Sequence, residues 1–287
     1  IGAPNAGKST LVNQLVGTKV SIVTHKVQTT RALVRGIFIE NNAQIVLVDT
    51  PGIFRPKRRL DRAMVTTAWG GAKDADIILV ILDAQGGLNE NAEALLESMV
   101  NVRQKKVLVL NKVDRVDPPK LLELAQKANE KVAFDRTFMI SALNGSGCKD
   151  LAKFLAETVP NGPWYYPEDQ ISDMPMRQLA AEITREKLYL RLHEELPYSS
   201  TVETERWEER KDGSVRIEQV IYVERESQKK IVLGHKGETI KAIGQSARKE
   251  ISEILEQNAH LFLFVKVREN WGNDPERYRE MGLDFPK

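Results

Sequence analysis

The sequence predicts an α/β domain with a mostly parallel sheet and helices on both faces, followed by a smaller α+β domain. Up to about residue 158, short apolar segments alternate with amphipathic ones, which is typical of parallel strands connected by helices. After a segment rich in Pro, Gly and Asp, the order becomes helix, strand, strand, helix, helix, strand. We therefore expect domains over residues 1–160 and 176–287, with a linker over 161–175.

The first domain should begin with a strand, because glycine-rich loops of this kind follow one. The chain starts one residue before such a loop, so we expect it to lack that first strand. Apolar runs predict strands over 33–40, 43–49, 76–83, 106–112 and 137–141, and helical periodicity predicts helices over 8–16, 59–69, 89–102, 119–131 and 149–158. In the second domain the same patterns predict a helix over 176–196, strands over 200–209 and 214–226, a glycine loop with a long helix, and a strand over 259–269.

Composition limits the class of protein. The chain has 287 residues, 41% hydrophobic and 29% charged, as in globular proteins. A single cysteine, Cys148, excludes an internal disulfide framework and fits a reducing, cytoplasmic setting. No apolar run reaches the ~20 residues that a membrane-spanning helix needs.

The stretch "GAPNAGKS", Gly2 to Ser9, matches the phosphate-binding P-loop pattern. Glycines let the backbone curl so that successive amides point at phosphate oxygens, and the following helix adds its positive N-terminal end. Lys8 would reach the β- and γ-phosphates, and the Ser9 hydroxyl would ligate Mg²⁺. The predicted phosphate contacts are Gly2, Ala3, Pro4, Asn5, Ala6, Gly7, Lys8, Ser9 and Thr10.

Three further motifs, "VLVDTPG", "LNKVD" and "ISALNGSG", complete a guanine nucleotide site. In "VLVDTPG", Asp49 ends an apolar strand and could hold Mg²⁺ through its water shell, and the Gly52 amide could contact the γ-phosphate. In "LNKVD", Asp114 can accept two hydrogen bonds that guanine offers and adenine does not. Lys112 can lie along the base, Asn111 can tie this loop to the P-loop, and Ser141 and Ala142 would close the base pocket. The four motifs in order indicate a P-loop GTPase domain.

With these motifs the chain resembles the translation-factor-related GTPases. By family register, Thr30 in "VQTTR" is the threonine that closes over Mg²⁺, with Thr29 as the second candidate. The residue after Asp-x-x-Gly is Ile53, which cannot orient water as a glutamine would. The resemblance implies that Asn5 coordinates a potassium ion instead. The alternative role for Asn5 is a loop residue that tolerates unusual backbone angles.

The stretch "KKIVLGHKGETIKAIGQSARK" places a second glycine loop far downstream. Net charge is only +2, yet from residue 229 to residue 249 there are six Lys or Arg and one acid. The glycine loop, these cations and the order of elements are those of a type II KH domain, which clamps about four nucleotides of single-stranded nucleic acid. The predicted RNA contacts are Lys230, Gly234, His235, Lys236, Gly237, Lys241 and Arg248.

The motifs "QTTR", "DTPGI", "NKVD", "PEDQISD", "LPYS" and "VLGHKGETIKAIG" together resemble the Era family of GTPases along essentially the whole chain. The resemblance implies GTP or GDP, Mg²⁺ and K⁺ as cofactors. It also implies binding of small-subunit (16S) ribosomal RNA near its 3′ end and a role in maturation of the 30S subunit. No stable oligomer is expected.

An alternative from another class stays open. The chain could be a GTPase signalling switch whose C-terminal domain docks a protein or a membrane surface, peripherally at the inner membrane face. The basic residues of the predicted helix over 176–196 could support this, but acids are interleaved with them, as on a solvated face. Salt dependence separates the two, because binding to RNA weakens steeply with salt.

Overall fold

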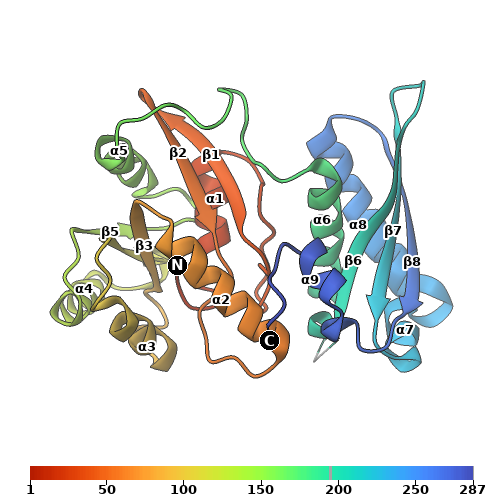
Figure 1. The fold of residues 1–287 in the computed structure, drawn as a ribbon, viewed down its shortest axis with the longest axis horizontal. Helices are drawn as coiled ribbons and strands as arrows, with labels where there is room; N and C mark the ends of the chain where they lie inside the picture. Colours follow the sequence, from red (N-terminus) through yellow and green to blue (C-terminus); the bar gives the residue numbers. More distant parts are fainter. Residues whose placement is uncertain (194–195, 287) are drawn as a thin grey trace. The chain divides into compact units, whose positions relative to one another are not determined.

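The structure, a computed structural model, describes residues 1–193 and 196–286 as two compact units (Figure 1). The first unit comprises residues 1–23, 30–173 and the residues from 281 onward, and the second comprises 24–29 and 174–280. The domain bounds expected from the sequence stay predictions. The helices and strands of the first unit are α1 (Lys8–Val16), β1 (Val34–Glu40), β2 (Ala43–Asp49), α2 (Arg59–Lys73), β3 (Ile77–Asp83), α3 (Glu90–Met99), β4 (Lys105–Asn111), α4 (Pro118–Lys131), β5 (Arg136–Ile140) and α5 (Cys148–Thr158).

The first unit is the predicted α/β domain. Strands β3, β4 and β5 form a parallel sheet in that order, with Asp83 beside Asn111 and Asn111 beside Ile140. The carboxyl ends of the strands therefore meet at one edge of the sheet. Strands β1 and β2 form an antiparallel pair. The predicted mostly parallel sheet thus describes β3–β5, while the short connection between β1 and β2 permits only an antiparallel hairpin.

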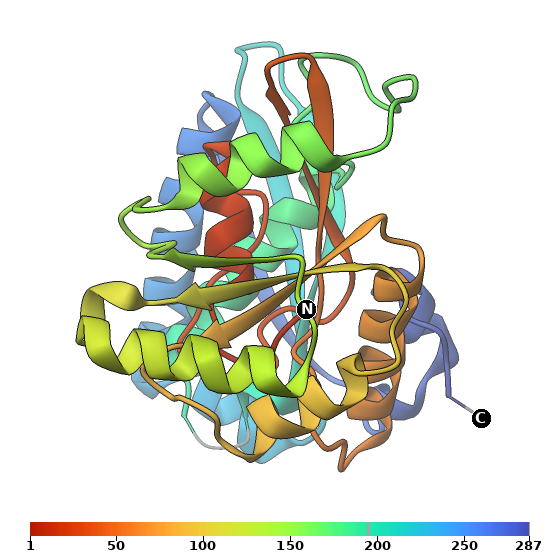
Figure 2. The same ribbon diagram turned by 90° about the vertical axis from the view of Figure 1, so that its left-hand side faces the viewer.

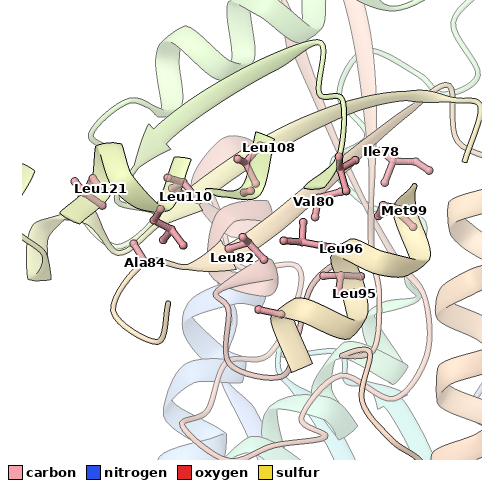
Figure 3. Packing of buried hydrophobic residues seen from close by; sticks show 14 of the residues in the cluster. Ile78, Val80, Leu82, Ala84, Leu95, Leu96, Met99, Leu108, Leu110 and Leu121 are labelled. Carbon is pink, nitrogen blue, oxygen red and sulfur yellow. The ribbon is translucent and has the colours of Figure 1, made fainter. Parts of the chain in front are cut away.

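Helices cover both faces of the parallel sheet, because its strands carry apolar side chains on both faces. Figure 2 shows α5 on one side of β5 and α4 on the other. Figure 3 shows the face toward α3, where side chains of β3 and β4 pack against Leu95, Leu96 and Met99. The opposite face buries Ile81, Val107 and Val109 against α1 and α5. Each such side chain contributes about 1.5–3 kcal/mol on burial, so the sheet edge that carries the motifs stands on a rigid base.

Strands β2 and β3 are not hydrogen-bonded to each other, and a cavity of about 780 Å³ has lining residues from both. Gly2 forms a parallel bridge with Ile81 of β3, so the chain enters the P-loop running parallel to β3. The expectation that the domain lacks its first strand stays a prediction.

The predicted linker is held against the first unit rather than running free. The Gln44 side chain accepts hydrogen bonds from the backbone amides of Tyr165 and Tyr166 and donates one to the Tyr166 carbonyl. Further along, Ile37 donates its amide to the Ile171 carbonyl. These bonds depend on residues more than 100 positions apart, so local sequence patterns do not show them.

The second unit has the predicted order of a type II KH domain. Its elements are α6 (Met176–Arg191), β6 (Ser200–Glu209), β7 (Val215–Val223), α7 (Glu226–Leu233), α8 (Glu238–Leu255), β8 (Ala259–Val267) and α9 (Pro275–Glu280). The sheet runs β6-β7-β8, with β6 and β7 antiparallel and β7 and β8 parallel. Helices α6 and α8 pack on β6 and β8, respectively, and on each other.

Three local differences from the sequence analysis have physical reasons. Helix α6 ends at Arg191, because Leu192 takes an extended backbone and packs into the core; residues 194 and 195 of the predicted helix lie outside the described residues. Helix α7 begins at Glu226, where the Gln228 side chain accepts the amides of residues 224 and 225, so the predicted strand stops earlier. The short helix α9 has too few residues to show a period.

Within the described part of the chain, every helix is too short or too polar to pass through a bilayer. The predicted peripheral membrane association stays a prediction.

Candidate nucleotide site and second glycine loop

The P-loop is packed tightly against β3 and against Asn111 at the end of β4. Gly2 lies against β3, where an added Cβ would meet the Ile81 carbonyl oxygen at 2.7 Å. Gly7 has a positive φ of 94° just before α1, and a Cβ there would meet Asn111 Nδ2 at 2.1 Å. Contacts with the core therefore require glycine at both positions, and the left-handed backbone favours glycine at position 7 as well.

Lys8 is buried and lies over the loop that it should serve. Its ammonium donates to the carbonyl oxygens of Gly2 (3.1 Å) and Ala3 (2.9 Å). Burial lowers the pKa of Lys8 to about 8, although the carboxylate of Asp49 acts in the opposite direction. A phosphate bound in the loop would stabilise the charged ammonium.

Ser9, Asp49 and Thr30 come together from three separate motifs. The Ser9 hydroxyl donates to Asp49 Oδ2 at 2.6 Å and shares a hydrogen bond of 2.9 Å with the Thr30 hydroxyl. Asp49 is 1% exposed, and its Oδ1 has no hydrogen-bond partner among the described residues. A buried carboxylate oxygen and two hydroxyls are oxygen ligands of the kind that Mg²⁺ prefers, directly or through water. The residues present therefore fit the ion.

The structure places Thr29 apart from this cluster. Its hydroxyl shares a hydrogen bond of 2.6 Å with that of Thr24 and donates to the Lys26 carbonyl. Of the two candidate threonines, Thr30 has the geometry for Mg²⁺. Gly52 lies against the P-loop, with an added Cβ 2.9 Å from the Pro4 nitrogen.

Asn5 lies on the exposed side of the loop with a φ of 62°. This left-handed backbone matches the alternative role, because asparagine tolerates it better than most residues. A side chain held there can also face a ligand. The geometry is compatible with both roles, and the potassium role stays a prediction.

Asn111 links the P-loop to the base pocket. Its Nδ2 donates to the Ala6 carbonyl at 2.8 Å, and its Oδ1 accepts the Ala142 amide at 2.9 Å. Asn111 is 2% exposed. One side chain thus fixes the P-loop and the loop after β5 relative to each other.

Asp114 follows Asn111 by three residues, in the short turn Val113–Arg115. The pKa of Asp114 lies below its usual range, chiefly because of the Ser141 hydroxyl, with smaller effects of the Arg115 and Lys112 charges. The Ser141 hydroxyl has no hydrogen-bond partner of standard geometry among the described residues. We therefore take it to act as a dipole close to the carboxylate. An ionised Asp114 is the state that accepts two guanine N–H groups.

Sequence reasoning missed two residues at this site. The Ser21 hydroxyl donates to Asp49 Oδ2 at 2.6 Å, from a loop in which no motif marks it. Asp83, at the end of β3, pairs with Lys112. Its position at the carboxyl end of a predicted strand could have signalled it, since ligands bind at that edge of parallel sheets.

The second glycine loop lies between α7 and α8. Gly234 is packed, since an added Cβ would meet Thr239 Oγ1 at 2.1 Å. Gly237 has a φ of 80° at the N-terminus of α8, and a Cβ there would meet nothing within 4 Å. The backbone at Gly237 is therefore open to a ligand.

The other predicted RNA-binding residues lie in this loop or on the two helices that flank it. Lys230, His235, Lys236, Lys241 and Arg248 are all exposed. Of the aliphatic residues near the loop, Val232 and Ile243 are fully buried and belong to the core, whereas Ile231 is 57% exposed. Ile231 is thus the aliphatic side chain best placed to contact a base.

Comparison with protein-family models gives two matches, one in each half of the chain. A model described as "50S ribosome-binding GTPase" matches residues 1–112, and a model described as "KH domain" matches residues 195–272. The chain is 94% identical over 286 residues to the GTPase Era of Brucella suis biovar 1, covering 100% of this chain and 92% of that protein. It is 77% identical over 286 residues to the GTPase Era of Mesorhizobium japonicum, with the same coverage.

The chain belongs to the Era family of GTPases.

Two solved structures of Era match this chain over almost its whole length. A crystal structure of Era in complex with MgGDPNP and nucleotides 1506–1542 of 16S ribosomal RNA matches with a TM-score of 0.92 and 38% identity, covering 98% of this chain and 96% of that one. A variant of Aquifex aeolicus Era bound to GDP and AlF4⁻ matches with the same score, identity and coverage. The α/β P-loop GTPase domain followed by a KH domain is therefore confirmed, and the chain is a GTPase.

Proposed function

We propose that the chain hydrolyses GTP with Mg²⁺ and K⁺, and that its nucleotide state controls binding of its KH domain to small-subunit ribosomal RNA near the 3′ end. This activity would serve maturation of the 30S subunit in the cytoplasm. The observation that carries the proposal is the pair of glycine loops. One lies at a cluster of buried hydroxyl and carboxylate ligands, and the other lies open among exposed cations.

For the nucleotide, the roles follow from position. The backbone of residues 2–10, through the amides of all but Pro4, and the Lys8 ammonium would hold the phosphates, and Gly52 would contact the γ-phosphate. Ser9, Thr30 and Asp49 would hold Mg²⁺, which neutralises charge on the phosphate oxygens. Asn111, Lys112, Asp114, Ser141 and Ala142 would hold guanine. The guanine-binding residues follow β4 and β5 at the carboxyl edge of one sheet, and the Asn111 side chain joins them to the P-loop, which supports a single shared ligand.

For hydrolysis, Ile53 offers no group that could orient water. A cation held by Asn5 would stabilise the charge that develops on the transferred phosphoryl group. This role can be separated from backbone tolerance, because glycine also tolerates the φ of 62°. We therefore compare wild type with Asn5→Gly, in K⁺ and in Na⁺ at equal ionic strength.

We expect the hydrolysis rate of wild type to be roughly tenfold or more lower in Na⁺ than in K⁺. Asn5→Gly should hydrolyse slowly in both salts and bind GDP normally. If Asn5→Gly keeps the K⁺ dependence, or if wild type has none, the potassium role is wrong.

For RNA, phosphate groups would approach the main chain at Gly237, next to the positive N-terminus of α8. Gly234, His235 and Lys236 complete this clamp, and Lys230, Lys241 and Arg248 would contact the backbone further along. The complex of Era with nucleotides 1506–1542 of 16S ribosomal RNA suggests the 3′ end as the target. Control by nucleotide requires that RNA bind the two nucleotide states with different affinity.

The test is the affinity for a single-stranded RNA that matches the 3′ tail of small-subunit ribosomal RNA, with GDP and with a non-hydrolysable GTP analogue. The variant is Gly237→Asp, which puts a carboxylate into the open space of the loop. Gly213→Asp is its matched control, because Gly213 has a φ of 78° with nothing within 4 Å and lies in the turn between β6 and β7.

We expect wild type to bind more tightly with the GTP analogue, Gly237→Asp to lose binding, and Gly213→Asp to behave as wild type. If Gly237→Asp and Gly213→Asp bind RNA equally well, the KH loop is not the RNA site. The protein-docking or membrane-docking switch would then explain the second unit better.

A further inference from the structure

Lys112 of the predicted guanine site forms an ion pair with a residue that no motif includes. Its Nζ lies 2.6 Å from Asp83 Oδ2. The two side chains are 26% and 27% exposed, so water screens the pair only in part. Asp83 ends β3, and its neighbour across the parallel sheet is Asn111, which ends β4. The pair therefore lies at the sheet edge where the nucleotide motifs meet.

Asp83 is itself held in one orientation. Its Oδ1 accepts the backbone amides of Gln85 (3.0 Å) and Gly86 (3.3 Å), which form a turn after β3. This leaves Oδ2 for Lys112. One oxygen of the carboxylate thus accepts the amides of the turn, and the other accepts a hydrogen bond from the ammonium group.

Lys112 stands where the chain turns sharply between β4 and the short helix that contains Asp114. Its backbone has φ 67° and ψ 35°, a left-handed conformation that is unfavourable for a residue with a side chain. Backbone strain of this kind persists only where surrounding structure maintains it. The ion pair adds a second restraint, on the far end of the Lys112 side chain.

We infer that Asp83 is a positioning residue for guanine binding, which holds the Lys112 ammonium so that the aliphatic part of Lys112 lies along the base. The inference rests on the proposed function of Lys112 and Asp114. A lysine that is already ordered loses less side-chain freedom when the nucleotide binds, and the affinity for the base rises accordingly.

Two substitutions separate the ion pair from the turn. Asp83→Asn keeps an oxygen for the amides of Gln85 and Gly86 but removes the charge that holds Lys112. Asp83→Ala removes both. For a partly exposed ion pair we expect Asp83→Asn to raise the GDP dissociation constant about three-fold without a change in thermal midpoint. Asp83→Ala should also lower the thermal midpoint.

A double-mutant cycle shows whether Asp83 acts through Lys112. Lys112→Met keeps the aliphatic chain and removes the ammonium. We expect Asp83→Asn to weaken GDP binding in the wild-type background and to have no further effect in Lys112→Met. If Asp83→Asn leaves GDP affinity unchanged, or if the two effects add independently, Asp83 does not position Lys112.

Failure of this inference is distinguishable from failure of the guanine site. Asp114→Ala is measured in the same titrations and should nearly abolish GDP binding. If Asp114→Ala and Lys112→Met weaken binding while Asp83→Asn does not, only the role of Asp83 is wrong. If Asp114→Ala binds GDP as wild type does, the guanine site is wrong and the inference is wrong with it.

Discussion

The two glycine loops of this chain each precede a helix, but their surroundings differ. In the P-loop, Gly2 and Gly7 both contact the core, at the Ile81 carbonyl and the Asn111 side chain. In the second loop, Gly234 is packed against Thr239, whereas Gly237 faces open space. In the first loop both glycines are thus held by packing, and in the second loop one glycine is packed and the other is open to solvent. This difference suits a compact nucleotide on one hand and a long polymer on the other.

The largest expected effect is on GDP affinity, from a substitution in the P-loop. Gly7→Ala places a Cβ against Asn111 Nδ2 in a left-handed backbone, so this amide must move away from its bond to Ala6, which also disturbs the bond of Asn111 to Ala142. We expect a loss of about 3 kcal/mol, or roughly 100-fold in GDP affinity. Titration calorimetry with GDP measures it.

The matched control is Gly17→Ala, which has a φ of 84° and nothing within 4 Å at the other end of α1. It should cost about 1–2 kcal/mol of stability and leave GDP affinity unchanged. Equal GDP affinities for the two variants would remove the distinction between a packed and an open glycine.

A second comparison stays within the open loop. Gly234→Ala forces a Cβ onto Thr239 and should destabilise the ends of α7 and α8 by about 2–4 kcal/mol. Gly237→Ala meets no atom and should cost about 1–2 kcal/mol for its backbone alone. Hydrogen exchange of the two helices reports both. Equal protection in the two variants would mean that Gly234 is not an anchor.

A smaller effect is expected from pH. The pKa of Lys8 is lowered to about 8 by burial, and bound phosphate should raise it. Below pH 8 Lys8 is charged with or without nucleotide, so its charge adds no pH dependence. Above pH 8 binding must take up a proton, and GDP affinity should fall up to tenfold per pH unit. The profile is measured up to pH 9, before guanine loses its own N1 proton. If the GDP affinity of wild type stays constant up to pH 9, the pKa of Lys8 is not lowered as described.

The comparison also shows what a sequence can predict. The P-loop, Asp49 and Asn111 follow from short motifs, because each occupies a fixed place in a glycine loop or at the end of a strand. The pair of Asp83 and Lys112 depends on the register of β3 against β4, which no local pattern specifies. Gln44, which holds the predicted linker, and Ser21, which shares Asp49 with Ser9, also act through contacts between residues that lie far apart in the sequence. The strand predicted over 214–226 extends too far, because the Gln228 side chain, rather than apolar periodicity, sets the start of α7.

The central claim is that the two loops hold phosphates of two different ligands. The most direct test is the salt dependence of RNA affinity for wild type, Lys8→Met and Lys236→Met. For single strands, each lost phosphate contact lowers the slope of log affinity against log salt by about 0.7. We predict this decrease for Lys236→Met and the wild-type slope for Lys8→Met, which should instead lose GDP binding. A wild-type slope for Lys236→Met, or a reduced slope for Lys8→Met, would contradict the claim.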